Sequence, residues 1–220
     1  MRDIPMFITE NGAAGLVLRE IPYKGSAYIT IHDTLRPKEL LQECVAACKM
    51  AGARCIYATG HRYLEEYPLH TEIWKMSRNR CDLPRTDAVL IPLTEENLEQ
   101  WREQYNGKMI PVPNGAAMTR EDGEKLLERK AGYYVRRSGE LIGLGIAAGN
   151  TVESVISLRW GSGGDVLLAL CGALQGEWVE LEVASANLPA LRLYDRLGFE
   201  KTAVLSKWYE IEKELTRKNT

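Results

Sequence analysis

Apolar and polar positions follow two periods along the chain, one typical of strands and one of helices. Short apolar runs rich in β-branched and aromatic residues predict strands at 27–31, 54–59, 71–77, 87–93, 132–137, 140–148, 151–158, 177–185 and 200–215. Apolar residues spaced by three or four predict helices within 36–52, 94–108, 114–130, 165–174 and 187–197, with a helical turn at 61–67. Strands therefore alternate with helices, which predicts an α/β fold with a central sheet.

The alternation runs twice along the chain, on either side of a polar stretch. Residues 78–85 are predicted to be a linker, and they end the basic run from Lys75, which is expected to be solvated. The segment from Lys38 can be aligned with the one from Asp165 so that Cys44 meets Cys171. The hypothesis is a first domain at 1–85 that is a partial copy of a second at 86–220.

Composition excludes several classes of protein. The chain has 220 residues, 45% apolar and 26% charged, with a net charge of −2, so no strong field attracts nucleic acid or an anionic membrane. No apolar run approaches the ~18 residues of a membrane span, and residues 1–10 do not have the pattern of a signal peptide. The five irregularly spaced cysteines indicate a reduced, cytoplasmic protein, with Cys44 and Cys48 read as core residues.

The stretch "VISLRWGSGGDVLLAL" is the first with suggestive chemistry: a strand, a loop with glycines at 161, 163 and 164, and a helix. Glycines and the free N–H groups of a helix start favour an anion such as phosphate. Neither the Walker pattern nor GxGxxG fits the loop, and a simple tight connection is the alternative reading. The glycines of "GLGIAAG" (143–149) precede another strand and are interpreted as strand irregularities or close packing.

The stretch "NLPALRLYDRLGFEK" is the second with suggestive chemistry. Asn187 is a good N-cap, Pro189 suits the first turn and Gly198 is a stop signal. Tyr194 lies on the apolar stripe of this helix, where a leucine would pack as well. Its hydroxyl either reaches a backbone carbonyl or takes part in chemistry.

The order of these two stretches resembles the GNAT superfamily of N-acetyltransferases, over about Ala88 to Ile211. The loop pattern R/Q-x-x-G-x-G/A of that family aligns with Arg159–Gly164, with Ser162 at the first glycine position. Downstream, the family spacing is matched by Asn187, Ala190, Leu193, Tyr194, Gly198 and Phe199. The resemblance implies a GNAT fold, with a mostly antiparallel mixed sheet. Two of its parallel strands, ending near Leu158 and Ala184, should diverge to admit CoA.

The resemblance also implies roles for individual residues. Tyr194 would protonate the departing CoA thiolate, and Glu153, on the strand before the loop, would be the general base; the alternative for Glu153 is a solvent-facing strand residue. The expected cofactor-binding residues are Ile156, Leu158, Arg159, Gly161, Ser162, Gly163, Gly164, Asp165 and Asn187. The alternative for Arg159 is a solvated position at the edge of the loop. Asn187 is expected to cap its helix, to contact the pantetheine, or to do both, and Cys171 is expected to pack.

The implied activity is transfer of an acetyl or other short acyl group from acetyl-CoA to a small-molecule or peptide amine, without metal. The two histidines of "HRYLEEYPLH", His61 and His70, lack a convincing third ligand. The acceptor is expected to depend on loops around 105–119, and the chain to be a monomer or homodimer. The alternatives are a catalytically inactive CoA-binding sensor or partner module and a ligand-free interaction scaffold.

Overall fold

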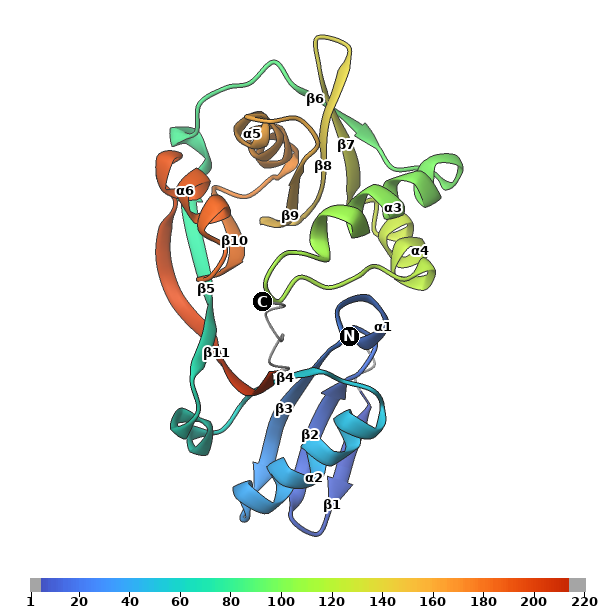
Figure 1. Ribbon diagram of the computed structural model, residues 1–220. Coiled ribbons are helices and arrows are strands. Elements are labelled where there is room, and N and C mark those ends of the chain that lie inside the picture. The colour runs from blue at the N-terminus through green and yellow to red at the C-terminus, as the bar shows by residue number, and fades with distance from the viewer. Residues whose placement is uncertain (1–4, 214–220) are drawn as a thin grey trace, which may run out of the picture. The chain divides into compact units, whose positions relative to one another are not determined.

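The computed structural model describes residues 5–213, and the chain forms two compact units (Figure 1). Of the described residues, one unit contains 5–73 and 205–213, and the other contains Trp74–Val204. These bounds differ from the division at 85/86 drawn from the sequence, because the end of the last strand returns to pair with strand residues 55–58 of the first unit. Glu214 and Leu215, predicted to end that strand, lie outside the described residues.

The first unit is a small sheet with one long helix. Its elements are β1 (Met6–Thr9), β2 (Gly12–Val17), α1 (Ile21–Lys24), β3 (Ser26–Thr34), α2 (Pro37–Met50), β4 (Cys55–Thr59) and the 3₁₀ turn η1 (Arg62–Glu66). β5 (Leu69–Asn79) and β11 (Glu200–Lys213) each contribute residues to both units. Cys44 and Cys48 of α2 are fully buried, as predicted, and the pKa of each thiol is raised by burial, to about 12 and about 11.

The second unit contains the two stretches that the sequence singles out. Its remaining elements are η2 (Arg80–Asp82), β6 (Val89–Pro92), η3 (Glu95–Asn97), α3 (Leu98–Met109), α4 (Arg120–Glu128), β7 (Gly132–Arg137), β8 (Glu140–Ala148), β9 (Thr151–Ser157), α5 (Gly163–Ala173), β10 (Trp178–Ala184) and α6 (Leu188–Arg196). Over residues 5–213 the strand order is β1-β2-β3-β4-β11-β5-β10-β9-β8-β7-β6. Most of the pairings are antiparallel, and β3–β4 and β9–β10 are parallel, which confirms the predicted mixed sheet.

Several local expectations were wrong. β1, β2 and α1 were not predicted, and the supposed linker begins with the end of β5 and continues into η2. Arg78 extends β5 and donates a hydrogen bond through Nη1 to the carbonyl oxygen of Gly198, 3.3 Å away. The polar residues Arg78 and Asn79 therefore continue the strand, where Arg78 Nη1 bonds to Gly198 and Asn79 Nδ2 to Glu177.

Helices cover both faces of strands β7, β8 and β9, with α5 on one face and α3 and α4 on the other (Figure 1). The predicted close packing at the β8 glycines is confirmed. A Cβ atom at Gly143 would lie 2.3 Å from a methyl of Val166, and one at Gly145 would lie 2.4 Å from a methyl of Leu170. The glycines let α5 lie directly on the sheet, which fixes where its N-terminus points. Within residues 5–213, no helix has the length and apolar character needed to cross a membrane.

Candidate functional site

The parallel strands β9 and β10 separate soon after they begin. Their register contains two residue pairs, Glu180 with Thr151 and Leu181 with Val152. By contrast, the parallel strands β3 and β4 of the first unit stay paired over five. Both pairs are joined by a helix, but only the second unit opens between its strands. This is the divergence expected from the sequence, and it begins beside a bulge in which Glu153 is the extra residue of β9 opposite β8.

The glycine-rich loop follows β9 and leads into α5, as predicted. Ser162 precedes the first turn of the helix and Gly163 begins it, so the N–H groups of the first turn face the loop. Gly161 has a φ of 81°, a left-handed conformation that favours glycine. The helix start therefore presents backbone donors and a positive dipole end next to the point where β9 and β10 have diverged.

Ser162, the departure from the family pattern, has a structural role. Its side chain is buried, and its Oγ lies 2.8 Å from the Ile142 carbonyl oxygen, 2.9 Å from the Arg159 carbonyl oxygen and 2.8 Å from Ser157 Oγ. The Ser157 hydroxyl also donates to the Arg159 carbonyl. The hydroxyls of Ser157 and Ser162 thus fix the loop by bonding to its carbonyl oxygens and to that of Ile142. These bonds leave the backbone amides of the first turn of α5 unused.

Asp165 lies in the first turn of α5 and places a negative charge at the same helix start. Its Oδ2 is 2.8 Å from Arg137 Nη1, and its Oδ1 accepts from the Thr86 hydroxyl at 2.9 Å. Arg137 also pairs with Asp87 at 2.7 Å. Any anion bound here would meet a carboxylate that is already paired, so the helix dipole and the backbone amides must supply most of the attraction.

A cleft of about 450 Å³ lies between this loop and the β7–β8 hairpin. It is lined by Arg137, Glu140, Ile142, Arg159, Trp160, Gly161, Ser162 and Asp165. Of the predicted cofactor-binding residues, four line this cleft, namely Arg159, Gly161, Ser162 and Asp165, and Gly163 and Gly164 lie in the adjoining first turn of α5. Ile156 and Leu158 instead face the side of the sheet covered by α3 and α4.

Helix α6 lies against the loop. A Cβ atom at Gly163 or Gly164 would be 3.3 Å or 3.9 Å from the methyl groups of Leu193. Asn187 caps α6, its Oδ1 accepting from the Ala190 amide at 3.3 Å, which confirms the capping interpretation. The helix ends at Gly198, whose φ of 75° permits the reversal. The two sequence motifs, about 30 residues apart, therefore meet in the structure.

Tyr194 is buried between α6 and the sheet. Its side chain is 7% exposed, and its ring lies 5.9 Å from that of Phe199, centroid to centroid. Burial raises the pKa of Tyr194 to about 12, and the neighbouring Cys171 adds to the increase. The phenol is therefore protonated at neutral pH, as a proton donor must be. Cys171 is itself buried in α5, as predicted for a packing residue.

Glu153 stands at the bulge where the strands begin to separate, but its carboxylate has a partner. Both Nη atoms of Arg129, the residue that ends α4, contact the two Glu153 oxygens, one of them at 3.3 Å. Glu153 is partly exposed, so the pair lies near solvent. A base role would require this guanidinium to move away.

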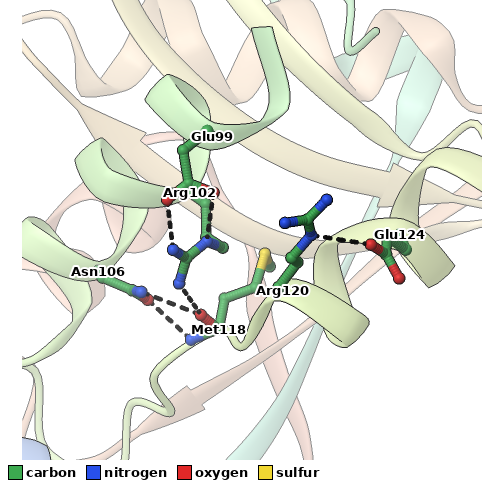
Figure 2. Close-up of polar contacts among 6 residues, drawn as sticks. All are labelled: Glu99, Arg102, Asn106, Met118, Arg120 and Glu124. Atoms are coloured by element: carbon green, nitrogen blue, oxygen red, sulfur yellow. Dashed lines mark hydrogen bonds and ion pairs between the residues drawn. The ribbon is translucent and has the colours of Figure 1, made fainter. Parts of the chain in front are cut away.

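The segment between α3 and α4 is fastened to α3 (Figure 2). The Asn106 amide accepts from the Met118 N–H at 2.7 Å and donates to the Met118 carbonyl at 3.0 Å, and Arg102 donates to the same carbonyl at 3.3 Å. Arg102 is in turn paired with Glu99. The loop in which the acceptor determinants were predicted therefore has a fixed end over the β7–β9 face.

The face of the sheet that α3 and α4 cover carries two hydroxyls that the sequence did not indicate. Tyr134 Oη on β7 and Ser154 Oγ on β9 are buried and have no hydrogen-bond partner among the described residues. Such groups destabilise a fold by about 1–3 kcal/mol each unless something else binds them. Both residues stand on strands next to the predicted site, and Ser154 follows Glu153 directly. No sequence signal marks them, because their burial depends on how the strands pair and on which face the helices cover.

The predicted absence of a metal site was argued from two histidines. His61 Nδ1 accepts from the Tyr63 N–H at 3.1 Å, and the ring of His70 lies 4.1 Å from that of Tyr57. Each histidine thus has a local structural contact. Among the described residues, no group of three or more histidine, cysteine, aspartate or glutamate side chains is arranged to hold a metal ion.

No protein-family model and no curated protein sequence matches the chain. Solved structures do. A conserved protein of unknown function from Staphylococcus epidermidis is similar over 96% of this chain and 94% of its own, with 13% identity and a TM-score of 0.59. A GCN5-related N-acetyltransferase from Kribbella flavida matches over 95% and 89%, with 14% identity and a TM-score of 0.56. An acetyltransferase of the GNAT family from Colwellia psychrerythraea matches over 93% and 84%, with 14% identity and a TM-score of 0.52.

At 13–14% identity, the similarity to these structures shows the fold alone. The chain has the fold of the GNAT superfamily, as the sequence resemblance implied.

Proposed function

We propose that the protein is an N-acetyltransferase, which moves an acetyl or other short acyl group from acyl-CoA to an amine. The observation that carries the proposal is the early separation of β9 from β10, next to a helix start with free amides. A linear thioester could enter between the strands while its pyrophosphate binds at the helix start. The GNAT fold of the chain supports this reading.

The pyrophosphate would bind the backbone amides of Gly161, Gly163, Gly164 and Asp165, with Arg159 available to its oxygens; the Ser162 amide already donates to the Arg159 carbonyl. The pantetheine would pass between β9 and β10 toward Tyr194, with Asn187 near its amides. Ile156 and Leu158, which face the α3–α4 side, would contact the acyl end or the acceptor. The unpartnered hydroxyls of Tyr134 and Ser154 are on that side too.

The chemistry is direct acyl transfer. The amine nitrogen attacks the thioester carbonyl carbon, and the C–S bond breaks as the tetrahedral intermediate collapses. Tyr194 donates its proton to the departing sulfur, and the attacking nitrogen loses one to a base. Glu153 is the proposed base, once Arg129 has moved away from it. A protonated phenol in a poorly solvated site avoids the cost of a free thiolate.

A CoA-binding module without catalysis is the alternative, and two observations favour it. Glu153 is held by Arg129, and the carboxylate of Asp165 occupies the helix start. Such a module would bind acetyl-CoA and not consume it. Turnover separates the two functions.

The test is release of the CoA thiol, followed with a thiol reagent, when the protein and acetyl-CoA are mixed with a panel of amines: polyamines, amino acids, aminoglycosides and lysine peptides. Transfer confirmed by mass spectrometry on at least one amine supports the enzyme. Binding of acetyl-CoA with no transfer to any amine would support the sensor. A scaffold would show neither.

A further inference from the structure

Trp160 is fully exposed at the tip of the loop between β9 and α5. Its exposed fraction is 103%, whereas Trp101 of the same unit is completely buried. Tryptophan is mostly buried in folded proteins, since its large apolar surface is costly to leave in water. The loop gives it no packing partner, so the fold itself does not account for a tryptophan here.

The surroundings of Trp160 indicate an anionic, aromatic ligand. It lines the cleft between the loop and the β7–β8 hairpin, together with Arg159 and Gly161. Arg159 makes no ion pair with any of the residues 5–213, whereas Arg137, the other cation of the cleft, is held by Asp87 and Asp165. An indole face beside an available guanidinium suits a nucleotide, whose base stacks while its phosphate pairs.

We propose that Trp160 is the stacking platform for the adenine of the acyl-CoA, with Arg159 on its phosphates. The inference rests on the proposed function and deepens it. If the pyrophosphate binds at the start of α5 and the pantetheine passes inward between β9 and β10, the adenosine must leave outward from the loop. Trp160 is the exposed aromatic side chain of that loop.

The test is calorimetric titration with CoA, 3′-dephospho-CoA and 4′-phosphopantetheine, which lacks the adenosine. Trp160→Ala should weaken binding of CoA and of dephospho-CoA by about 5- to 150-fold, the usual range for loss of one base–aromatic stack. Phosphopantetheine should bind the variant as it binds the wild type. Trp160→Phe, which keeps a smaller ring, should recover most of the CoA affinity.

A matched control is available on the same unit. Trp178 is half exposed at the start of β10, the end opposite to the loop, so Trp178→Ala should leave all three affinities unchanged. Unchanged CoA affinity in Trp160→Ala, or an equal loss for phosphopantetheine, would overturn the inference while the proposed function stood. A wild type that does not bind CoA would overturn both.

Discussion

Replacing Tyr194 by phenylalanine separates a catalytic hydroxyl from a packing one. The ring is 7% exposed and packs against Phe199, so phenylalanine fits the same space and leaves no cavity. The free energy of unfolding should change by no more than about 1.5 kcal/mol, the range for one hydrogen bond. The fold should therefore survive the substitution.

The expected effect on turnover is much larger. General acid catalysis typically contributes ~10²–10⁴-fold, so kcat should fall by at least about 100-fold with little change in the affinity for acetyl-CoA. The pH dependence follows from the raised pKa of Tyr194, about 12. At pH 8 only about one phenol in ten thousand is ionised, so the proton needed for donation is present up to about pH 10 and is lost only as the pH nears 12.

The assay is release of the CoA thiol by wild type and Tyr194→Phe between pH 6 and 10, with thermal unfolding of both proteins. A loss of kcat with an unchanged unfolding midpoint would support the role of Tyr194 as general acid. Turnover within about twofold of the wild type would refute it, and Tyr194 would then be a packing residue. A basic limb near pH 8 that disappears in the variant would contradict the raised pKa.

Three further substitutions test other parts of the structure. Gly145→Ala should lower the free energy of unfolding by about 1–3 kcal/mol in chemical denaturation, because its Cβ would lie 2.4 Å from a methyl group of α5, whereas Gly172→Ala, in open space on α5, should not destabilise. Glu153→Gln should reduce kcat by about 100-fold or more if Glu153 is the base; an effect of less than threefold would leave it a surface partner of Arg129. Asp165→Asn should tighten acetyl-CoA binding in calorimetry several-fold, more so at low salt, since it removes a negative charge from the helix start; weaker binding would contradict the anion site.

Local sequence signals account for the motifs because the physics involved is local. The cap at Asn187, the stop at Gly198 and the glycines against α5 each depend on a few neighbouring residues or on one close packing contact. The short strands β1 and β2 were missed because their formation depends on pairing and not on a local pattern. β2 reads "GAAGLV", whose small residues show no clear alternation, and the pairing with β3 makes it a strand.

The charges at the site could not have been predicted, because their partners are distant in sequence. Asp165 meets Thr86, 79 residues away, and Arg137, 28 residues away. Glu153 was predicted as the candidate base or as a solvent-facing strand residue, and neither prediction included Arg129, which the end of α4 places against it. Whether residues 1–85 are a partial copy of the second half stays a prediction, although β3–α2–β4 and β9–α5–β10 share their parallel arrangement.

The decisive measurement of the CoA site is calorimetric titration of the wild type, Gly164→Trp and Gly172→Trp with acetyl-CoA. Gly164 lies in the first turn of α5, next to Leu193 of α6, where an indole side chain would cover the backbone amides. Gly172 lies at the other end of the same helix, and a side chain there would face open space. The wild type and Gly172→Trp should bind acetyl-CoA with micromolar affinity, and Gly164→Trp should not bind it. No binding by the wild type, or undiminished binding by Gly164→Trp, would contradict the proposed CoA site.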